Sequence, residues 1–139
     1  MRTVFLDTGY FVARLNPNDQ HHERALWMAD QLLGARCVTS DLVLVELLNW
    51  ASKRSANVRK ACATIALEFL NGNPDECVAA DRASIVRAIE ACRDSPASRK
   101  ARPGATDAHA MEAMSRRGIT VVASFDRHFK RPGIRVLAP

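Results

Sequence analysis

Four carboxylates, those of Asp7, Glu46, Asp107 and Asp126, occur in surroundings that would normally be apolar. Asp7 and Asp126 follow closely on short apolar segments, whereas Glu46 and Asp107 share helical rows with apolar side chains. A carboxylate removed from water is costly unless it is paired or protonated. Three of the four fall at predicted strand ends or helix starts, which one rim of a parallel sheet would bring together. Their charges would then repel one another unless a cation lay among them.

The cation that suits such a site is a hard divalent ion. Carboxylate oxygens with no cysteine and few histidines beside them favour Mg²⁺ or Mn²⁺. An ion of this kind activates water and neutralises the charge that develops on a phosphate. The four carboxylates therefore predict metal-dependent hydrolysis of a phosphodiester. In-line attack by the activated water would leave a 5′-phosphate and a 3′-hydroxyl.

Each carboxylate also has a purely structural explanation, which the sequence leaves open. Asp7 and Asp107 could cap helices near the positive end of the helix dipole. Glu46 could pair with an arginine, and Asp126 could stabilise a turn. A different enzyme, an aspartyl-phosphate phosphatase that uses Asp7, is disfavoured. That chemistry usually needs a second aspartate two residues further on, where this chain has Gly9.

Basic side chains are concentrated in the last third of the chain. The formal net charge of the whole chain is +5. Residues 1–92 hold 10 basic and 11 acidic side chains, whereas residues 93–139 hold 10 basic and 4 acidic ones. This asymmetry favours a polyanionic partner such as RNA, and binding should then depend on salt. The side chains predicted to contact RNA are Arg99, Lys100, Arg102, Arg116, Arg127 and His128.

Short apolar segments alternate with longer helical ones along the chain. Strands are predicted at 4–6, 37–39, 77–79, 120–124 and 134–137, and helices at 8–15, 20–33, 42–54, 58–70, 82–92 and 106–117. This alternation implies an α/β fold with a parallel sheet covered on both faces, in three α/β/α layers. No repeat or linker interrupts it, which predicts one domain, 1–139. Thr8 and Thr106 are expected to cap helices, and Ser40 or Asp41 a third.

The composition is that of a globular protein, with 47% hydrophobic and 25% charged residues. No apolar run approaches the roughly 18–20 residues that span a bilayer. Asp7 interrupts any signal-peptide pattern, so a cytoplasmic location without membrane contact is expected. Four widely spaced cysteines lack metal-ligand spacing and are interpreted as reduced, buried apolar residues.

Four short motifs follow one another along the chain: Val4-Phe5-Leu6-Asp7-Thr8, Val43-Leu44-Val45-Glu46-Leu47-Leu48-Asn49, Thr106-Asp107-Ala108 and Ser124-Phe125-Asp126-Arg127-His128-Phe129. Together they resemble the PIN-domain family, and within it the VapC-type toxins of bacterial type II toxin–antitoxin modules. The resemblance extends over essentially the whole chain. It implies a parallel sheet of strand order 3-2-1-4-5 with the acidic cluster at its carboxyl edge. It also implies metal-dependent endoribonuclease activity.

The same resemblance implies roles for individual residues. Asp7, Asp107 and Asp126 would be metal ligands, and Glu46 would complete the cluster, either directly or through a metal-bound water. Thr8 and Ser124 match positions that support the site in the family.

The histidines are not expected to bind the metal. On a helix, His109 would point about 200° away from Asp107. His128 lies in a predicted loop, where it would contact RNA or cap Asp126. His21 and His22 are expected to have packing or surface roles.

The resemblance also implies protein partners. A small antitoxin would present a helix to an apolar groove between the early helices, and the toxin would form a homodimer. Candidates to line the groove are Tyr10, Phe11, Trp27 and Trp50, which could instead be core aromatics. The alternative function is a non-catalytic PIN-fold module that binds RNA or a partner. Such a module would have no need to keep four carboxylates that repel one another.

Overall fold

Five parallel strands form the central sheet of the computed structural model, which describes residues 1–138. The last residue of the predicted domain, Pro139, lies outside the described residues. The strands are β1 (Thr3–Leu6), β2 (Arg36–Ser40), β3 (Cys77–Val78), β4 (Val121–Ala123) and β5 (Arg135–Val136). Their order is β3-β2-β1-β4-β5, so the predicted order 3-2-1-4-5 is confirmed.

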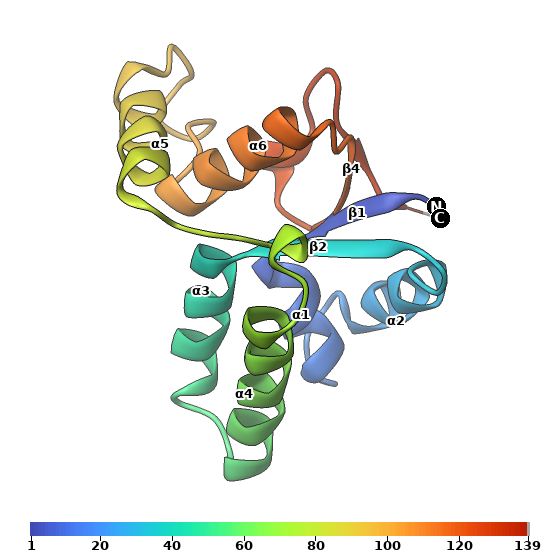
Figure 1. Ribbon diagram of the computed structural model, residues 1–139. Coiled ribbons are helices and arrows are strands. Elements are labelled where there is room, and N and C mark those ends of the chain that lie inside the picture. The colour runs from blue at the N-terminus through green and yellow to red at the C-terminus, as the bar shows by residue number, and fades with distance from the viewer. Residues whose placement is uncertain (139) are drawn as a thin grey trace.

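Helices cover both faces of this sheet, which confirms the predicted three-layer arrangement. Figure 1 shows α1 to α4 on one side of β1 and β2, and α5 and α6 on the other. The α-helices are α1 (Thr8–Leu15), α2 (His22–Gln31), α3 (Asp41–Ala51), α4 (Ala56–Asn71), α5 (Arg82–Asp94) and α6 (Ala105–Arg117). Two 3₁₀ turns, η1 (Pro74–Glu76) and η2 (Arg127–Phe129), precede β3 and follow β4.

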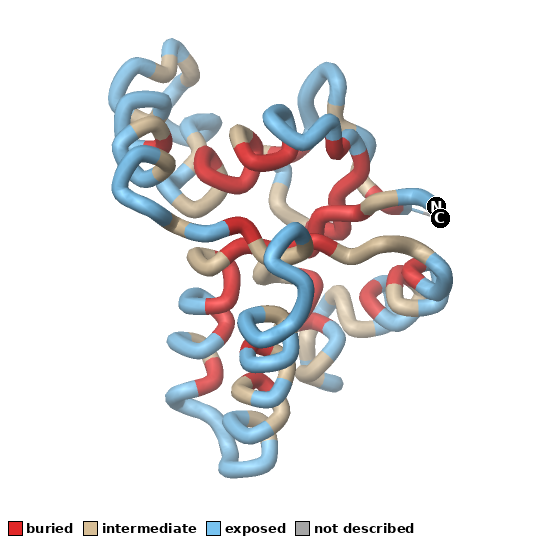
Figure 2. Tube along the Cα trace, in the orientation of Figure 1, coloured by how far each residue is buried: buried red, intermediate tan, exposed pale blue. Residues whose placement is uncertain are grey.

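The core is built around β1, the middle strand of the sheet. Val4 and Phe5 are fully buried, because β2 and β4 flank the strand and helices cover both of its faces. Figure 2 shows buried chain running through β1 and β2 and into the adjoining ends of α1, α3 and α6. The Thr39 hydroxyl on β2 donates to the Leu6 carbonyl at 2.8 Å. This bond fixes the end of β1, where the chain turns into α1.

Two of the predicted helix caps were wrong. Asp7, not Thr8, occupies the N-cap position of α1, and α6 begins at Ala105 after Gly104, so Thr106 lies inside the helix. Ser40 does cap α3, because its Oγ accepts a hydrogen bond from the Val43 N–H at 3.2 Å. The predicted position of this cap, just after β2, is confirmed.

Among residues 1–138, no helix is long and apolar enough to cross a membrane. The cysteines are free thiols, as predicted. Their predicted burial holds only for Cys62, whereas Cys37, Cys77 and Cys92 are half-buried.

Candidate metal centre

Asp7 lies at the carboxyl end of β1, and only 5% of its surface is exposed. Its backbone N–H donates to the Ala123 carbonyl at 3.1 Å, which continues the pairing of β1 with β4. Its side chain makes no N-cap hydrogen bond, so the capping explanation does not account for it. Burial raises the pKa of Asp7 to about 6, and the charges of Asp126 and Glu46 add to the rise. The surroundings of Asp7 therefore disfavour its ionised form.

Ser124 connects Asp7 to the loop that follows β4. The buried Ser124 hydroxyl donates to Asp7 Oδ2 at 2.7 Å and accepts from the Asp126 N–H at 3.0 Å. Asp126 Oδ1 in turn accepts from the His128 N–H at 2.9 Å and so caps the turn η2. The predicted turn role of Asp126 is thus present, in addition to its place beside the other carboxylates.

Glu46 reaches the site from α3. The expectation that it lies on the core-facing row was wrong, because Val43 and Leu47 are buried whereas Glu46 is exposed. Its Oε1 accepts a hydrogen bond from the Thr8 hydroxyl at 2.7 Å. No arginine of residues 1–138 pairs with it. Thr8 therefore links the first turn of α1 to the carboxylate on α3, a contact that sequence reasoning missed.

Asp107 lies in the first turn of α6 and is half-buried. Burial, together with the charges of Asp126, Asp7 and Glu46, raises the pKa of Asp107 to about 8. These charges can act on Asp107 only because the carboxylates are near one another. The structure thus brings all four predicted acidic residues together at the carboxyl edge of the sheet.

His128 also lies in this cluster. Its Nδ1 is 2.6 Å from Asp126 Oδ1 and 3.5 Å from Asp107 Oδ2. The contact with Asp126 is short but lacks hydrogen-bond geometry. Asp107, Asp126 and His128 each offer one ligand atom within 4.8 Å of the others, a spacing at which they could share a metal ion. The only sequence signal was a histidine two residues after Asp126. His109 points elsewhere, as expected, and contacts Ser84.

The loop 95–104, which carries three of the predicted RNA-contacting side chains, is joined to the turn η2 that follows Asp126. The Arg127 guanidinium donates from Nη2 to the Lys100 carbonyl at 2.8 Å and so ties the basic loop 95–104 to η2. Arg99, Lys100 and Arg102 on this loop are exposed. Arg116 is different, because nine residues of helix place it on the opposite face of α6 from Asp107.

The donor set fits a hard divalent cation. It consists of four carboxylates and one imidazole, groups that suit Mg²⁺ or Mn²⁺. The raised pKa values of Asp7 and Asp107 show that the cluster disfavours its own negative charge. A cation among these side chains would remove that repulsion, so the residues present fit the predicted ion.

Comparison with known families agrees with this fold. The PIN domain model matches residues 4–134. The chain belongs to the PIN domain family. No curated protein sequence matches the chain significantly.

Similar solved structures cover nearly the whole chain. One is VapC20 of Mycobacterium tuberculosis, described as a toxin that cleaves the sarcin–ricin loop, with a TM-score of 0.77 and 22% identity over 98% of this chain and 99% of that one. FitAcB of Neisseria gonorrhoeae has a TM-score of 0.62 and 15% identity, covering 96% and 95%. VapBC2 of Rickettsia felis, bound to a promoter DNA fragment, has a TM-score of 0.61 and 17% identity, covering 97% of each chain. At these identities the likeness establishes the fold.

Proposed function

We propose that this protein is a metal-dependent endoribonuclease and the toxin of a type II toxin–antitoxin module. The observation that carries the proposal is the convergence of four carboxylates, from four separate elements, at one edge of the sheet. Burial and mutual repulsion raise the pKa of two of them, Asp7 and Asp107. A fold has no stability reason to gather such groups, whereas a nuclease needs them to hold a divalent ion.

The side chains of this protein would hold the ion and supply the negative charge that binds it. Asp7, Asp107 and Asp126 would hold Mg²⁺ or Mn²⁺, with Glu46 completing the set. When bound, the ion supplies the Lewis acidity that activates water and offsets charge on the phosphate. The Ser124 hydrogen bond fixes the orientation of the Asp7 carboxylate.

RNA is the substrate that the surrounding charge favours. The exposed basic side chains of the loop 95–104 lie beside the cluster, because Arg127 joins this loop to η2. Phosphate contacts by lysine and arginine hold a nucleic-acid backbone without regard to sequence. They would therefore draw the strand across an acidic centre that would otherwise repel it. The sarcin–ricin loop activity described for VapC20 supports an RNA substrate here.

The test is incubation of the purified protein with total RNA in Mn²⁺, in Mg²⁺ and in EDTA. We expect fragments with 5′-phosphate ends in the presence of metal and intact RNA in EDTA. Cleavage should weaken steeply with salt, because backbone binding releases counterions. If the protein binds no divalent ion by calorimetry and cuts no RNA, the non-catalytic module is the better description.

We further propose that a small antitoxin binds over α4. Leu67 and Leu70 on this helix are 56% and 53% exposed, and Leu33, which follows α2, is 81% exposed. Exposed apolar side chains of this kind mark protein-interaction surfaces. Tyr10 and Phe11, predicted as groove residues, are core residues instead, with 1% and 4% exposed. Their burial leaves the leucines to supply the apolar contact. The likeness to the FitAcB and VapBC2 structures supports such a partner.

Leu67→Glu should weaken antitoxin binding by about tenfold or more, because it places a charge in an apolar contact. Each variant is co-purified with the antitoxin from the native source. The measurements are the amount of antitoxin retained and the inhibition of RNA cleavage that it causes. Ile89→Glu is the matched control, since Ile89 is 54% exposed but lies on α5 across the sheet. Equal loss of the antitoxin in both variants would contradict this docking surface.

A further inference from the structure

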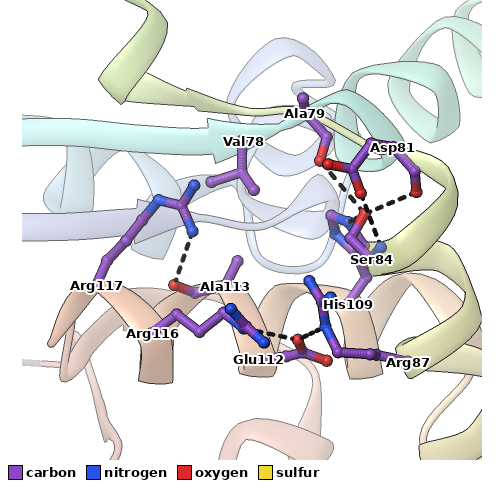
Figure 3. Close-up of a pocket in the computed structure, with 10 residues that line it drawn as sticks. All are labelled: Val78, Ala79, Asp81, Ser84, Arg87, His109, Glu112, Ala113, Arg116 and Arg117. Carbon is purple, nitrogen blue, oxygen red and sulfur yellow. Dashed lines mark hydrogen bonds and ion pairs between the residues drawn. The ribbon is translucent and has the colours of Figure 1, made fainter.

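A second polar pocket lies between α5, α6 and the end of β3, away from the acidic cluster (Figure 3). Its volume is about 420 Å³, which is within the range of small-molecule sites. His109, Glu112 and Arg116 line it from α6. Asp107 faces the acidic cluster instead, so one helix contributes to two separate sites.

The most unusual group in this pocket is the imidazole of His109, which is 2% exposed. Its Nε2 lies 3.0 Å from Ser84 Oγ. The Ser84 hydroxyl also contacts the Asp81 carbonyl at 3.0 Å and the Ala79 carbonyl at 3.5 Å. This leaves Nδ1 as the second ring nitrogen to satisfy.

The unpartnered atom is therefore the His109 Nδ1. This atom is buried and has no hydrogen-bond partner among the described residues. A buried polar atom without a partner is costly. A ligand hydroxyl at this end of the pocket, which can donate or accept, would satisfy it.

The arginines that line the pocket supply a second property, a surplus of hydrogen-bond donors. Glu112 Oε1 accepts from Nε of Arg116 at 2.9 Å and also from Nε of Arg87. Both guanidinium groups are thus held through Nε, with their terminal N–H groups free of hydrogen-bond partners in residues 1–138. Arg117 is a third guanidinium on the lining, and its Nη1 makes a long 3.4 Å bond to the Ala113 carbonyl. Guanidinium groups fixed in this way are suited to phosphate.

The two properties are separated in space. Figure 3 shows Arg117 and Arg116 toward one end, and Asp81, Ser84 and His109 toward the other. Apolar Val78 and the small side chains of Ala79 and Ala113 form part of the wall. The pocket therefore matches an elongated ligand with an anionic group at one end, donor groups at the other, and an uncharged body between them.

We propose that this pocket binds a nucleoside monophosphate, either free or as one unit of an RNA chain. The phosphate meets Arg116 and Arg117, and a sugar hydroxyl bonds to the unpartnered His109 Nδ1. The carboxylate of Asp81 is an acceptor for ligand donors at that end. Arg116, which stands apart from the acidic cluster, thereby acquires a binding role of its own.

The test is calorimetric titration of the full chain with 5′-AMP in EDTA, which keeps divalent ions out of the acidic cluster. We expect saturable binding of 5′-AMP, and binding of adenosine that is about tenfold weaker or less because it lacks the phosphate. Arg116→Gln should weaken 5′-AMP binding by about tenfold. Arg93→Gln is the matched control, because Arg93 is an exposed α5 arginine that pairs with Asp94 outside the pocket.

His109→Gln tests the other end of the pocket. The glutamine amide can still bond to Ser84, but Nδ1 is removed, so 5′-AMP should bind more weakly although the melting temperature is little changed. A short RNA titrated into Asp7→Asn protein in EDTA separates the two sources. Competition between RNA and 5′-AMP identifies a unit of RNA, and its absence identifies a free nucleotide. The proposal is overturned if wild-type protein does not bind 5′-AMP, or if Arg116→Gln and His109→Gln bind it as well as wild type. Neither outcome depends on RNA cleavage.

Discussion

Asp7→Asn is expected to abolish metal-dependent RNA cleavage while leaving the fold intact. The substitution keeps the size of the side chain and its capacity to accept the Ser124 hydrogen bond, but removes the charge that a divalent ion needs. Metal-ion stabilisation of a phosphoryl transition state is worth several kcal/mol, so the rate should fall on the order of 10³-fold or more. The measurement is the rate of RNA cleavage in saturating Mn²⁺.

Asp30→Asn is the matched control for this experiment. Asp30 is exposed near the end of α2 and makes no side-chain contact with the cluster, so its substitution should leave the rate unchanged. Circular dichroism of both variants would verify the fold. If Asp7→Asn protein cuts RNA at the wild-type rate, Asp7 is not a ligand and the proposed site is wrong.

The metal-free protein should lose stability as the pH rises from about 4 to about 8. Burial raises the pKa of Asp7 to about 6 and that of Asp107 to about 8, from an ordinary value of 3.8. Across this interval the folded chain binds more protons at these groups than the unfolded chain does. The free energy of unfolding therefore falls with pH until both groups are ionised. Mn²⁺ should reverse the trend, and its stabilising effect should grow with pH because it displaces protons.

Asp107→Asn should flatten this pH dependence and stabilise the metal-free protein at pH 8. One unit of pKa shift corresponds to about 1.4 kcal/mol, so a gain of at least ~1 kcal/mol is expected. Thermal melts in EDTA at pH 5 and pH 8 provide the measurement, with Asp30→Asn as control. A variant that is less stable than wild type at pH 8 would show that Asp107 stabilises the fold rather than strains it.

The alternating sequence pattern was sufficient to predict the layers, and the resemblance to the PIN-domain family supplied the strand order, but neither gave the ends of the elements. Alternating apolar and amphipathic segments indicate βα units whatever their limits, because burial on both faces of a parallel sheet leaves a strong pattern. The end of α2 was misplaced because Leu32 and Leu33 continue the apolar row although the helix ends at Gln31. Local turn geometry, rather than hydrophobicity, decides such boundaries.

The acidic residues were found because each stands against an apolar background. His128 could not be placed in the same way, since its position depends on the 3₁₀ turn that returns its ring to Asp107. The Thr8–Glu46 bond joins positions 38 residues apart and leaves no periodic signal. The nucleotide pocket was missed because arginine and glutamate on a helix look like an ordinary solvated face. The homodimer stays a prediction.

The pairing of β1 with β4 has a consequence for the synthesis of the protein. Asp7 and Ser124, which share a hydrogen bond, are separated by 117 positions, and β1 pairs with β4 from Val4↔Val121 to Leu6↔Ala123. Contacts so distant along the chain cannot form until both positions have been synthesised. A growing chain that already contains Asp7, Glu46 and Asp107 still lacks the strand that supports Asp7 and the loop that brings Asp126. The acidic cluster is therefore not assembled on the ribosome until almost all of these residues have been synthesised.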